Sequence, residues 1–348
     1  MVQMACEKVE MPLVSVVLLT YNRPDYLREA LSSAVGQTYQ NLEILVCNNA
    51  SDLPTTEVIN SFDDSRIVHI QRFENIGMTQ NAVLGSKATR GKYLAHLHDD
   101  DIWEPTFIEK LVSGLEKHPE AVVAFCDHFI INSRGEIDLP ASNVNTAFWK
   151  RDRLEPGLHQ PFYKMALFDK SIPVVMGCVL RNNVIDWEDF PRLKFNYDFW
   201  MIYLACREGG AAYYVPERLS RYRVHGESCT SKESAILMPE AFAQCFERII
   251  AENRIPISKR KLNRAVGNHY LSLAVALMRG GQAGKARKFV RQGFRHAPSL
   301  RSFAALLLGY SPKSLRRYCL AHPIHLEPKE HRYPDSTKYK QKCSSAVS

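Results

Sequence analysis

The sequence predicts an α/β fold built on a mostly parallel sheet flanked by helices, with a helical extension at its C-terminal end. Two observations lead to this prediction. In the first half of the chain, short apolar runs rich in β-branched residues alternate with stretches in which apolar residues recur every three or four positions, as in sheets covered on both faces. Beyond about residue 235, only the helical spacing remains.

The first strand is expected at 13–19, because this continuous apolar run ends in a polar turn at 20–25. Apolar residues then recur at helical spacing through Val35, which predicts a helix that returns the chain to the next strand. A second strand at 42–47 and a third at 67–70 complete a βαβαβ pattern. Such units form right-handed parallel sheets, and ligands bind at the carboxyl ends of their strands.

The remaining elements continue this alternation. The segment 132–160 shows no period and is rich in Asn, Pro and Gly, so it is predicted to be a long surface excursion. Further strands are expected at 93–97, 121–126, 173–180 and 213–216, and further helices near 81–89 and at 105–117, 197–208, 262–279 and 283–296.

Charge divides the chain into two parts. Residues 258–320 contain fourteen Lys or Arg and no Asp or Glu, while the whole chain carries +8, so the remainder carries about −6. We therefore expect an α/β domain over residues 1–234, a basic helical module over 235–325 and a disordered tail over 326–348.

Composition bounds the class of protein. The chain has 348 residues, 45% hydrophobic and 24% charged, as in a globular protein. No run approaches the ~18 apolar residues of a membrane-spanning helix, and the first ten residues lack the pattern of a secretory signal. Nine cysteines are scattered singly without a CxxC pair, which favours a reducing cytoplasm and no zinc site.

Three successive carboxylates, Asp99, Asp100 and Asp101, follow the apolar run at 93–97. Such a cluster repels itself unless a cation binds there, and carboxylates at the end of a buried strand suit Mg²⁺ or Mn²⁺. These ions usually also bind phosphate groups of a substrate. The alternative is an Asp-rich turn that caps the helix beginning near Glu104.

Polar loops follow three of the predicted strands directly, at 20–23, 48–52 and 98–101. The carboxyl ends of parallel strands meet at one edge of a sheet, so these loops are expected to converge. The sequence therefore predicts a ligand site at this edge.

With these loops in place, the first 230 residues resemble the inverting GT-A glycosyltransferases of family 2, which use nucleotide-diphosphate sugars. The resemblance implies a GT-A fold with a nucleotide-sugar half at about 11–130 and an acceptor half at about 131–234. Four motifs in the family's order carry it: Ser15 to Arg23 (SVVLLTYNR), Asn75-x-Gly77 with Asn81 and Gly91-Lys92-Tyr93, Leu97 to Asp101, and Tyr197-Asp198-Phe199-Trp200 followed by Leu219 to Ser228.

The resemblance implies metal-dependent transfer of a sugar, with inversion, from a nucleotide-diphosphate donor to a glycan or lipid-linked acceptor in cell-envelope or exopolysaccharide synthesis. This chemistry needs charge neutralisation on the leaving phosphates and a base for the acceptor hydroxyl. Asp198 is the candidate base, and Mn²⁺ or Mg²⁺ is expected on Asp100 with Asp99 and His225. The implied nucleotide-sugar site comprises Thr20, Tyr21, Asn22, Arg23, Asn48, Asn75, Gly77, Asn81, Asp99, Arg221 and Arg223.

Plain structural interpretations stand beside two of these roles. Asp198 is equally typical of a carboxylate that begins a helix, and His225 of an ordinary turn. Asn196 stands where the family often has a further acid, so the base could be Glu188 or Asp189, or the protein could be catalytically silent.

The nucleotide pocket departs from the family in two places. Asn48-Asn49 stands where many relatives have an acid that binds uracil, and His98 stands where an Asp is common. An amide can accept from a ring N–H and donate to a ring carbonyl, so pyrimidine binding is retained. UDP or dTDP sugars are therefore favoured over GDP sugars.

The basic module has three interpretations. Its cations and apolar residues are typical of a helical surface that docks on an anionic membrane, here the inner face of the cytoplasmic membrane. Equally, the charges can be the solvated face of a packed helical hairpin. Nucleic-acid binding is disfavoured, because no reader module is recognised and the carboxylate cluster would repel phosphates without a metal.

Two other functions remain as alternatives. A nucleotidyltransferase would also place carboxylates and Mg²⁺ against a nucleotide, but it needs a Gly-rich loop after the first strand, and residues 20–24 contain no glycine. A dinucleotide-dependent oxidoreductase is disfavoured because no GxGxxG follows that strand. A silent glycan-binding or scaffold protein is the non-enzyme alternative, and Asn196 is the residue that supports it.

Overall fold

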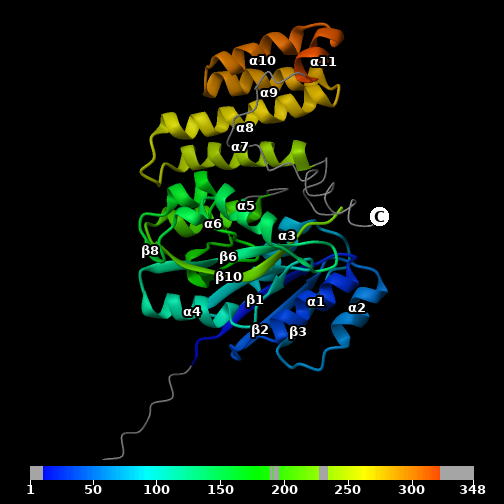
Figure 1. The fold of residues 1–348 in the computed structure, drawn as a ribbon, viewed down its shortest axis with the longest axis vertical. Coiled ribbons are helices and arrows are strands. Elements are labelled where there is room, and N and C mark those ends of the chain that lie inside the picture. The colour runs from blue at the N-terminus through cyan, green and yellow to red at the C-terminus, as the bar shows by residue number, and fades with distance from the viewer. Residues whose placement is uncertain (1–10, 189, 191–195, 227–233, 322–348) are drawn as a thin grey trace, which may run out of the picture. The chain divides into compact units, whose positions relative to one another are not determined.

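The computed structural model describes residues 11–188, 190, 196–226 and 234–321 (Figure 1). They form two compact units: the first extends to Val224, and the second contains Asn196 and the residues from His225 onward. The functional division of the chain at residue 234 stays a prediction.

The first unit is built on one mixed sheet with strand order β3-β2-β1-β4-β9-β6-β10-β5, to which β7 and β8 attach at β6 and β10. Strands β1, β2, β3 and β4 are parallel to one another. The strands are β1 (Val14–Thr20), β2 (Leu42–Asn48), β3 (Ile67–Gln71), β4 (Tyr93–His98), β5 (Ile102–Trp103), β6 (Ala121–Ile131), β7 (Ile137–Asp138), β8 (Gly157–His159), β9 (Cys178–Arg181) and β10 (Ala211–Arg223).

Three central strands owe their position to apolar sequence. Every residue of β1 and β2 is buried, as are the first five of β4, and sheets covered on both faces select such runs. The register pairs Thr20 with Asn48 and Leu19 with His98, so these strands end side by side. The predicted convergence of the three polar loops is confirmed at this edge.

Six α-helices belong to the first unit, in the part of the chain that the structure describes. The helix α4 shows the expected pattern most clearly, because Phe107, Leu111 and Leu115 recur at helical spacing and are fully buried. The helices are α1 (Pro24–Val35), α2 (Leu53–Asn60), α3 (Met78–Lys87), α4 (Phe107–Lys117), α5 (Leu139–Phe148) and α6 (Tyr197–Arg207).

The prediction of a surface excursion over 132–160 was wrong in part, because this segment contains α5. The Asp138 carboxylate caps the helix by accepting a hydrogen bond from the Ala141 N–H at 2.8 Å. Arg151, 2% exposed, then ties the segment to the sheet by donating to Asp127 at 2.6 Å. The segment is therefore anchored in the core at this point.

Two strands differ from their predicted form. β9 begins only at Cys178 and runs antiparallel to both β4 and β6. The chain leaves the sheet after β6 and re-enters it at the same edge, which reverses the direction of β9. β10 extends far beyond the expected 213–216. It passes Pro216 by a bulge between Val215 and Arg218, where the missing N–H of proline costs no ladder bond.

The second unit is a stack of helices (Figure 1), each packed against its predecessor through α10. The expected helix over 283–296 matches the observed bounds, and the one at 262–279 begins three residues earlier, after the Ser258 cap. None of the helices in the described residues has the length and apolar character needed to cross a membrane. The helices are α7 (Ser234–Glu252), α8 (Lys259–Arg279), α9 (Ala283–His296), α10 (Leu300–Tyr310) and α11 (Lys313–Ala321).

Candidate functional site

The turn after β4 places three carboxylates at the edge where the polar loops meet. The Asp101 N–H donates to the His98 carbonyl at 3.2 Å, which closes the turn. Asp99 and Asp101 are 4% and 2% exposed, whereas the Asp100 side chain is 13% exposed. Asp100 is therefore the carboxylate most open to a ligand.

The loop after β1 contacts this turn directly. The Tyr21 N–H donates to Asp99 at 3.1 Å, and the Arg23 guanidinium donates to Asp99 at 3.2 Å and to Asp100 at 2.9 Å. Arg23 thus supplies part of the positive charge that the cluster needs. Asn22 bends the loop with a φ of 52°, and its side chain accepts from the Asp52 N–H at 2.8 Å.

The electrostatics of the turn favour a bound cation. Burial and the neighbouring Asp100 raise the pKa of Asp99 to about 6 and the pKa of Asp101 well above its ordinary value. Ionising all three groups near neutral pH is therefore costly despite Arg23. A divalent cation would remove that cost by stabilising the charged forms.

One group of side chains has the arrangement of a metal site. Ligand atoms of His98, Asp100 and Asp101 lie within 4.8 Å of one another. Burial lowers the pKa of His98, which leaves its imidazole neutral, as metal ligation requires. Two carboxylates and one imidazole suit Mn²⁺. They also suit Mg²⁺, although this ion has less preference for a nitrogen ligand. The residues present therefore fit the ion that the sequence predicts.

This group differs from the predicted ligands. It contains Asp100 as expected, but His98 and Asp101 stand in place of Asp99 and His225. Asp99 instead faces Tyr21 and Arg23. His98 was not predicted as a ligand, although an imidazole directly before the carboxylates at a strand end is visible in the sequence.

Arg223, which the sequence places at the diphosphate, has another position. Its side chain is fully buried, and its guanidinium donates to the Asp100 carbonyl at 2.9 Å, the Ser133 carbonyl at 3.2 Å and the Glu29 carboxylate at 2.7 Å. The Arg223 N–H also donates to the Asp101 carboxylate at 3.1 Å. A guanidinium held in this way does not reach a phosphate, so Arg223 positions the carboxylate turn.

The amides after β2 also differ from expectation. Asn48 is fully buried, and its side chain donates to Gln71 at 2.8 Å and accepts from the Ser51 N–H at 2.9 Å. It shapes the loop and does not face a nucleobase. Asn49, 5% exposed, donates to the exposed Asn75 at 2.8 Å, which joins this loop to the one before α3.

The residues at the start of α3 also hold this loop and the helix in place. Gly77 has a φ of 82°, which side chains rarely adopt, and its N–H donates to the Asn75 side chain at 2.9 Å. Asn81 is 1% exposed and donates to the Cys47 carbonyl at 2.8 Å, so it ties α3 to β2. Asn81 therefore has a structural role and holds α3 in place from a buried position. Thr20 is buried at the end of β1, with 3% exposure.

Asp198 lies in the first turn of α6, close to His98, Asp100 and Asp101, which are here called the metal group. The Tyr197 hydroxyl and the His98 Nε2 are 2.9 Å apart, and Asp198 and His98 each shift the other's pKa. Burial raises the pKa of Asp198 above its ordinary value. A partly exposed carboxylate with a raised pKa beside a cation site has the properties of a general base.

The other predicted residues are not members of this group. Arg221 pairs with Glu104 at 2.7 Å, and His225 belongs to the second unit, so its role as a ligand stays a prediction. Glu188 pairs with Lys87 at 2.7 Å and is 85% exposed, which is a surface position. Asp189 lies outside the described residues, as do residues 227 and 228 of the last motif.

Asn196, the departure from the family's acid, has a structural role. Its φ is 63°, a conformation that Asn tolerates better than most residues, and its side chain donates to the Met238 carbonyl at 3.2 Å. This bond lies within the second unit.

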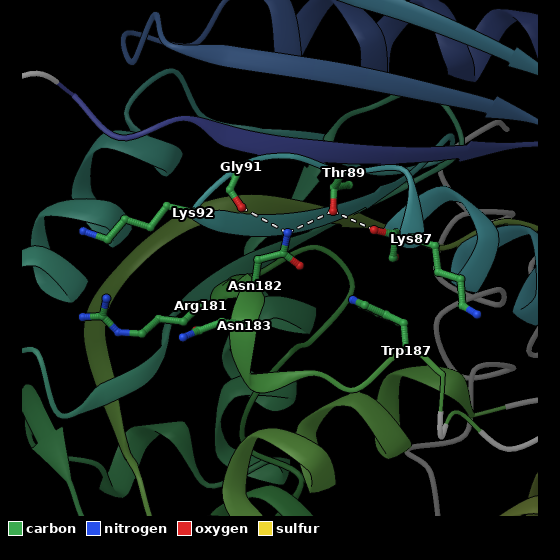
Figure 2. Close-up of a pocket in the computed structure, with 9 residues that line it drawn as sticks. Lys87, Thr89, Gly91, Lys92, Arg181, Asn182, Asn183 and Trp187 are labelled. Atoms are coloured by element: carbon green, nitrogen blue, oxygen red, sulfur yellow. Dashed lines mark hydrogen bonds between the residues drawn. The ribbon is translucent and has the colours of Figure 1, made fainter.

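A cavity of about 480 Å³ lies at the amino end of β4, away from the carboxylates (Figure 2). The Asn182 amide donates to the Gly91 carbonyl and the Thr89 hydroxyl, both at 3.0 Å, so part of its polar lining is paired internally. Its lining residues are Ser86, Lys87, Thr89, Gly91, Lys92, Arg181, Asn182, Asn183 and Trp187.

Comparison with known sequences decides the family. A model of glycosyl transferase family 2 matches residues 15–174. An uncharacterized glycosyltransferase of Haemophilus influenzae is 33% identical over 228 residues, which cover 63% of this chain and 68% of that protein. The chain belongs to glycosyl transferase family 2. It is therefore an enzyme that transfers sugars.

A second relative of this glycosyltransferase carries a specific name. Escherichia coli WfaP, a UDP-Glc:α-D-GlcNAc-diphosphoundecaprenol β-1,3-glucosyltransferase, is 35% identical over 106 residues, 30% of this chain and 42% of that protein. The match lies within one part of each chain, so it carries the family and not the specificity.

Solved structures show the same fold. TarS 1–349 of S. aureus, in complex with UDP-GlcNAc, has a TM-score of 0.64 at 15% identity, covering 88% of this chain and 91% of that chain. The mannosyltransferase PcManGT of Pyrobaculum calidifontis, in complex with GDP-Man and Mn²⁺, has a TM-score of 0.56 at 17% identity, covering 90% and 85%. The expected GT-A fold with C-terminal helices is confirmed.

Proposed function

We propose that this glycosyltransferase moves a sugar from a UDP or dTDP donor to a glycan or lipid-linked acceptor, with inversion and with Mn²⁺ or Mg²⁺, in cell-envelope or exopolysaccharide synthesis. The observation that carries the proposal is the group of His98, Asp100 and Asp101 at the edge where the loops after β1 and β2 converge. Ligands of open α/β sheets bind at such edges.

The cation is supported by the ligand group and by a structural neighbour that binds Mn²⁺. When bound, the ion would neutralise charge on the leaving diphosphate. Arg23 lies beside Asp99 and Asp100, so its guanidinium adds positive charge at the place where the phosphates would bind. The Tyr21 loop holds Asp99 in place, and Asp99 is the candidate contact for the ribose.

Asp198 is proposed as the base. Its carboxylate takes the proton of the acceptor hydroxyl while that oxygen bonds to the anomeric carbon and the bond to the diphosphate oxygen breaks. The acceptor attacks from the face opposite the leaving group, so the configuration inverts. Burial keeps the carboxylate basic enough to hold this proton, because it raises the pKa of Asp198.

The donor and acceptor classes rest on weaker support. TarS was solved with UDP-GlcNAc and PcManGT with GDP-Man, and the name of WfaP gives UDP-Glc and an undecaprenol-linked acceptor. Asn48 does not favour pyrimidines by direct contact, since its amide is buried. The UDP or dTDP preference therefore rests on the family resemblance and on WfaP.

The test is calorimetric titration of UDP, dTDP and GDP with Mn²⁺ and with a chelator. One nucleotide should bind far more tightly with the metal, and Asp100→Asn should reduce its affinity to the level seen with chelator. Glu109→Gln is the matched control, because this carboxylate accepts a hydrogen bond from Thr38 on an exposed surface. Equal affinity with and without metal in the wild type would contradict the assignment of the site.

A further inference from the structure

The outer surface of α10 and α11 exposes large apolar side chains. In α10 these recur every three or four residues, which places them along one side of the helix. The side chains that α10 buries are different ones, including Ala305 and Leu308. The exposed set, here called the apolar stripe, consists of Leu300 (90% exposed), Phe303 (50%), Leu307 (59%), Tyr310 (49%), Leu315 (51%) and Tyr318 (64%).

The helices that carry the apolar stripe also expose cations, and a cation of α9 contacts the stripe. Arg301, Lys313 and Arg317 are exposed on the same two helices. From α9, the guanidinium of Arg287 lies 4.6 Å from the centre of the Tyr310 ring. Residues 258–320 contain no Asp or Glu, so no carboxylate of these helices balances the charge.

We propose that the apolar stripe and the cations of the same helices dock on an anionic lipid surface. Lipid headgroups attract the Lys and Arg side chains, while the boundary with the acyl chains accepts Phe303, Leu307 and the aromatic rings. Tyr310 suits this boundary because its ring is apolar and its hydroxyl polar. Without such a partner, the large apolar side chains of the stripe would stay exposed to water, which is unfavourable.

Other occupants match these features less well. A second copy of the chain would bring one strongly basic surface against another, at the cost of like-charge repulsion. Nucleic acid would satisfy the cations but would leave Leu300 and Leu307 in water. Only an anionic lipid surface pairs with both features. The proposal concerns the second unit and does not rest on the metal site in the first.

The test is co-sedimentation of the full chain with phosphatidylcholine vesicles, with and without about 30% phosphatidylglycerol, at low and high salt. Binding should require the anionic lipid and decrease with salt. The double variant Phe303→Ser and Leu307→Ser should weaken it by roughly tenfold or more. Neutralising Arg301, Lys313 and Arg317 to Gln should weaken it about fivefold per charge.

The matched control is Leu139→Ser with Val144→Ser on α5, two side chains that are 51% and 49% exposed in the first unit. This variant should bind vesicles like the wild type. Absence of binding, equal binding to neutral vesicles, or loss in the control alone would overturn the proposal. So would a self-association or RNA binding that depends on Phe303 while vesicles are not bound. Metal-dependent nucleotide titration of the same variants separates this outcome from failure of the proposed function.

Discussion

Replacing Arg223 by Met tests whether this buried residue holds the carboxylate turn. The substitution keeps a long apolar side chain and removes the guanidinium. The carbonyls of Asp100 and Ser133 then lose a charged donor, and Glu29, whose side chain is 45% exposed, loses its ion pair. Hydrogen bonds to a charged group typically contribute about 1.5–3 kcal/mol, and we expect a loss of this size in the free energy of unfolding.

Arg221→Met is the matched control on the same strand. Arg221 is 32% exposed and pairs with Glu104, also partly exposed, so its loss should cost under about 1 kcal/mol. Urea denaturation followed by circular dichroism measures both free energies. Equal losses in the two variants would refute the reasoning.

The same pair of variants has a functional readout. Arg223 donates to the carbonyl of Asp100, whose side chain belongs to the metal group. Residues that orient metal ligands typically contribute about 10–100-fold to metal affinity. Mn²⁺ affinity should therefore decrease by about that factor in Arg223→Met and stay near the wild-type value in Arg221→Met. Arg223→Lys keeps the charge but loses the planar, forked guanidinium, so its Mn²⁺ affinity should lie between those of the other two variants.

The other predictions concern pH. Burial raises the pKa of Asp198, so transfer should be lost as the pH falls through that raised pKa, and Asp198→Asn should abolish transfer while nucleotide affinity is retained. Burial lowers the pKa of His128 to about 3. As the pH falls, His128 takes up a proton in the unfolded chain before it does so in the folded protein. Between about pH 7.5 and about pH 5, this difference should lower the free energy of unfolding of the wild type by ~2 kcal/mol, and His128→Asn should not show this loss.

Each pH prediction has a result that would contradict it. A pH–rate profile without an acid limb, or full turnover in Asp198→Asn, would move the base to another residue. For His128, unfolding free energies of the wild type and the variant that run parallel between the two pH values would show that this imidazole is not held neutral in the folded state.

The sheet at the site could be predicted because its central strands are mostly apolar and end in polar loops. Burial on both faces selects Val and Leu at most positions of β1, and such a run is legible in the sequence. The same logic gave the position of the carboxylates, since a strand that is followed by Asp99 can only place it at the carboxyl edge.

Other parts of the site depend on contacts that one sequence does not reveal. Asn48 and Arg223 were expected to face the ligand, but their partners are backbone and side-chain groups brought together by the fold. Helix α5 was missed although Asp138 followed by Pro140 is a helix-start signal, because its polar residues hide the helical spacing. β10 was cut short because Pro216 usually ends a strand, and the bulge that accommodates it is invisible in sequence.

The contact of Arg23 with Asp99 and Asp100 has a consequence for how the enzyme matures. With a guanidinium already between two of its carboxylates, the turn has partial charge balance before any ion arrives. We expect the newly made chain to fold without manganese or magnesium, and its circular dichroism spectrum to be the same with a chelator. Under the proposed metal dependence, a cell short of the ion would accumulate folded, idle enzyme that becomes active when the ion returns.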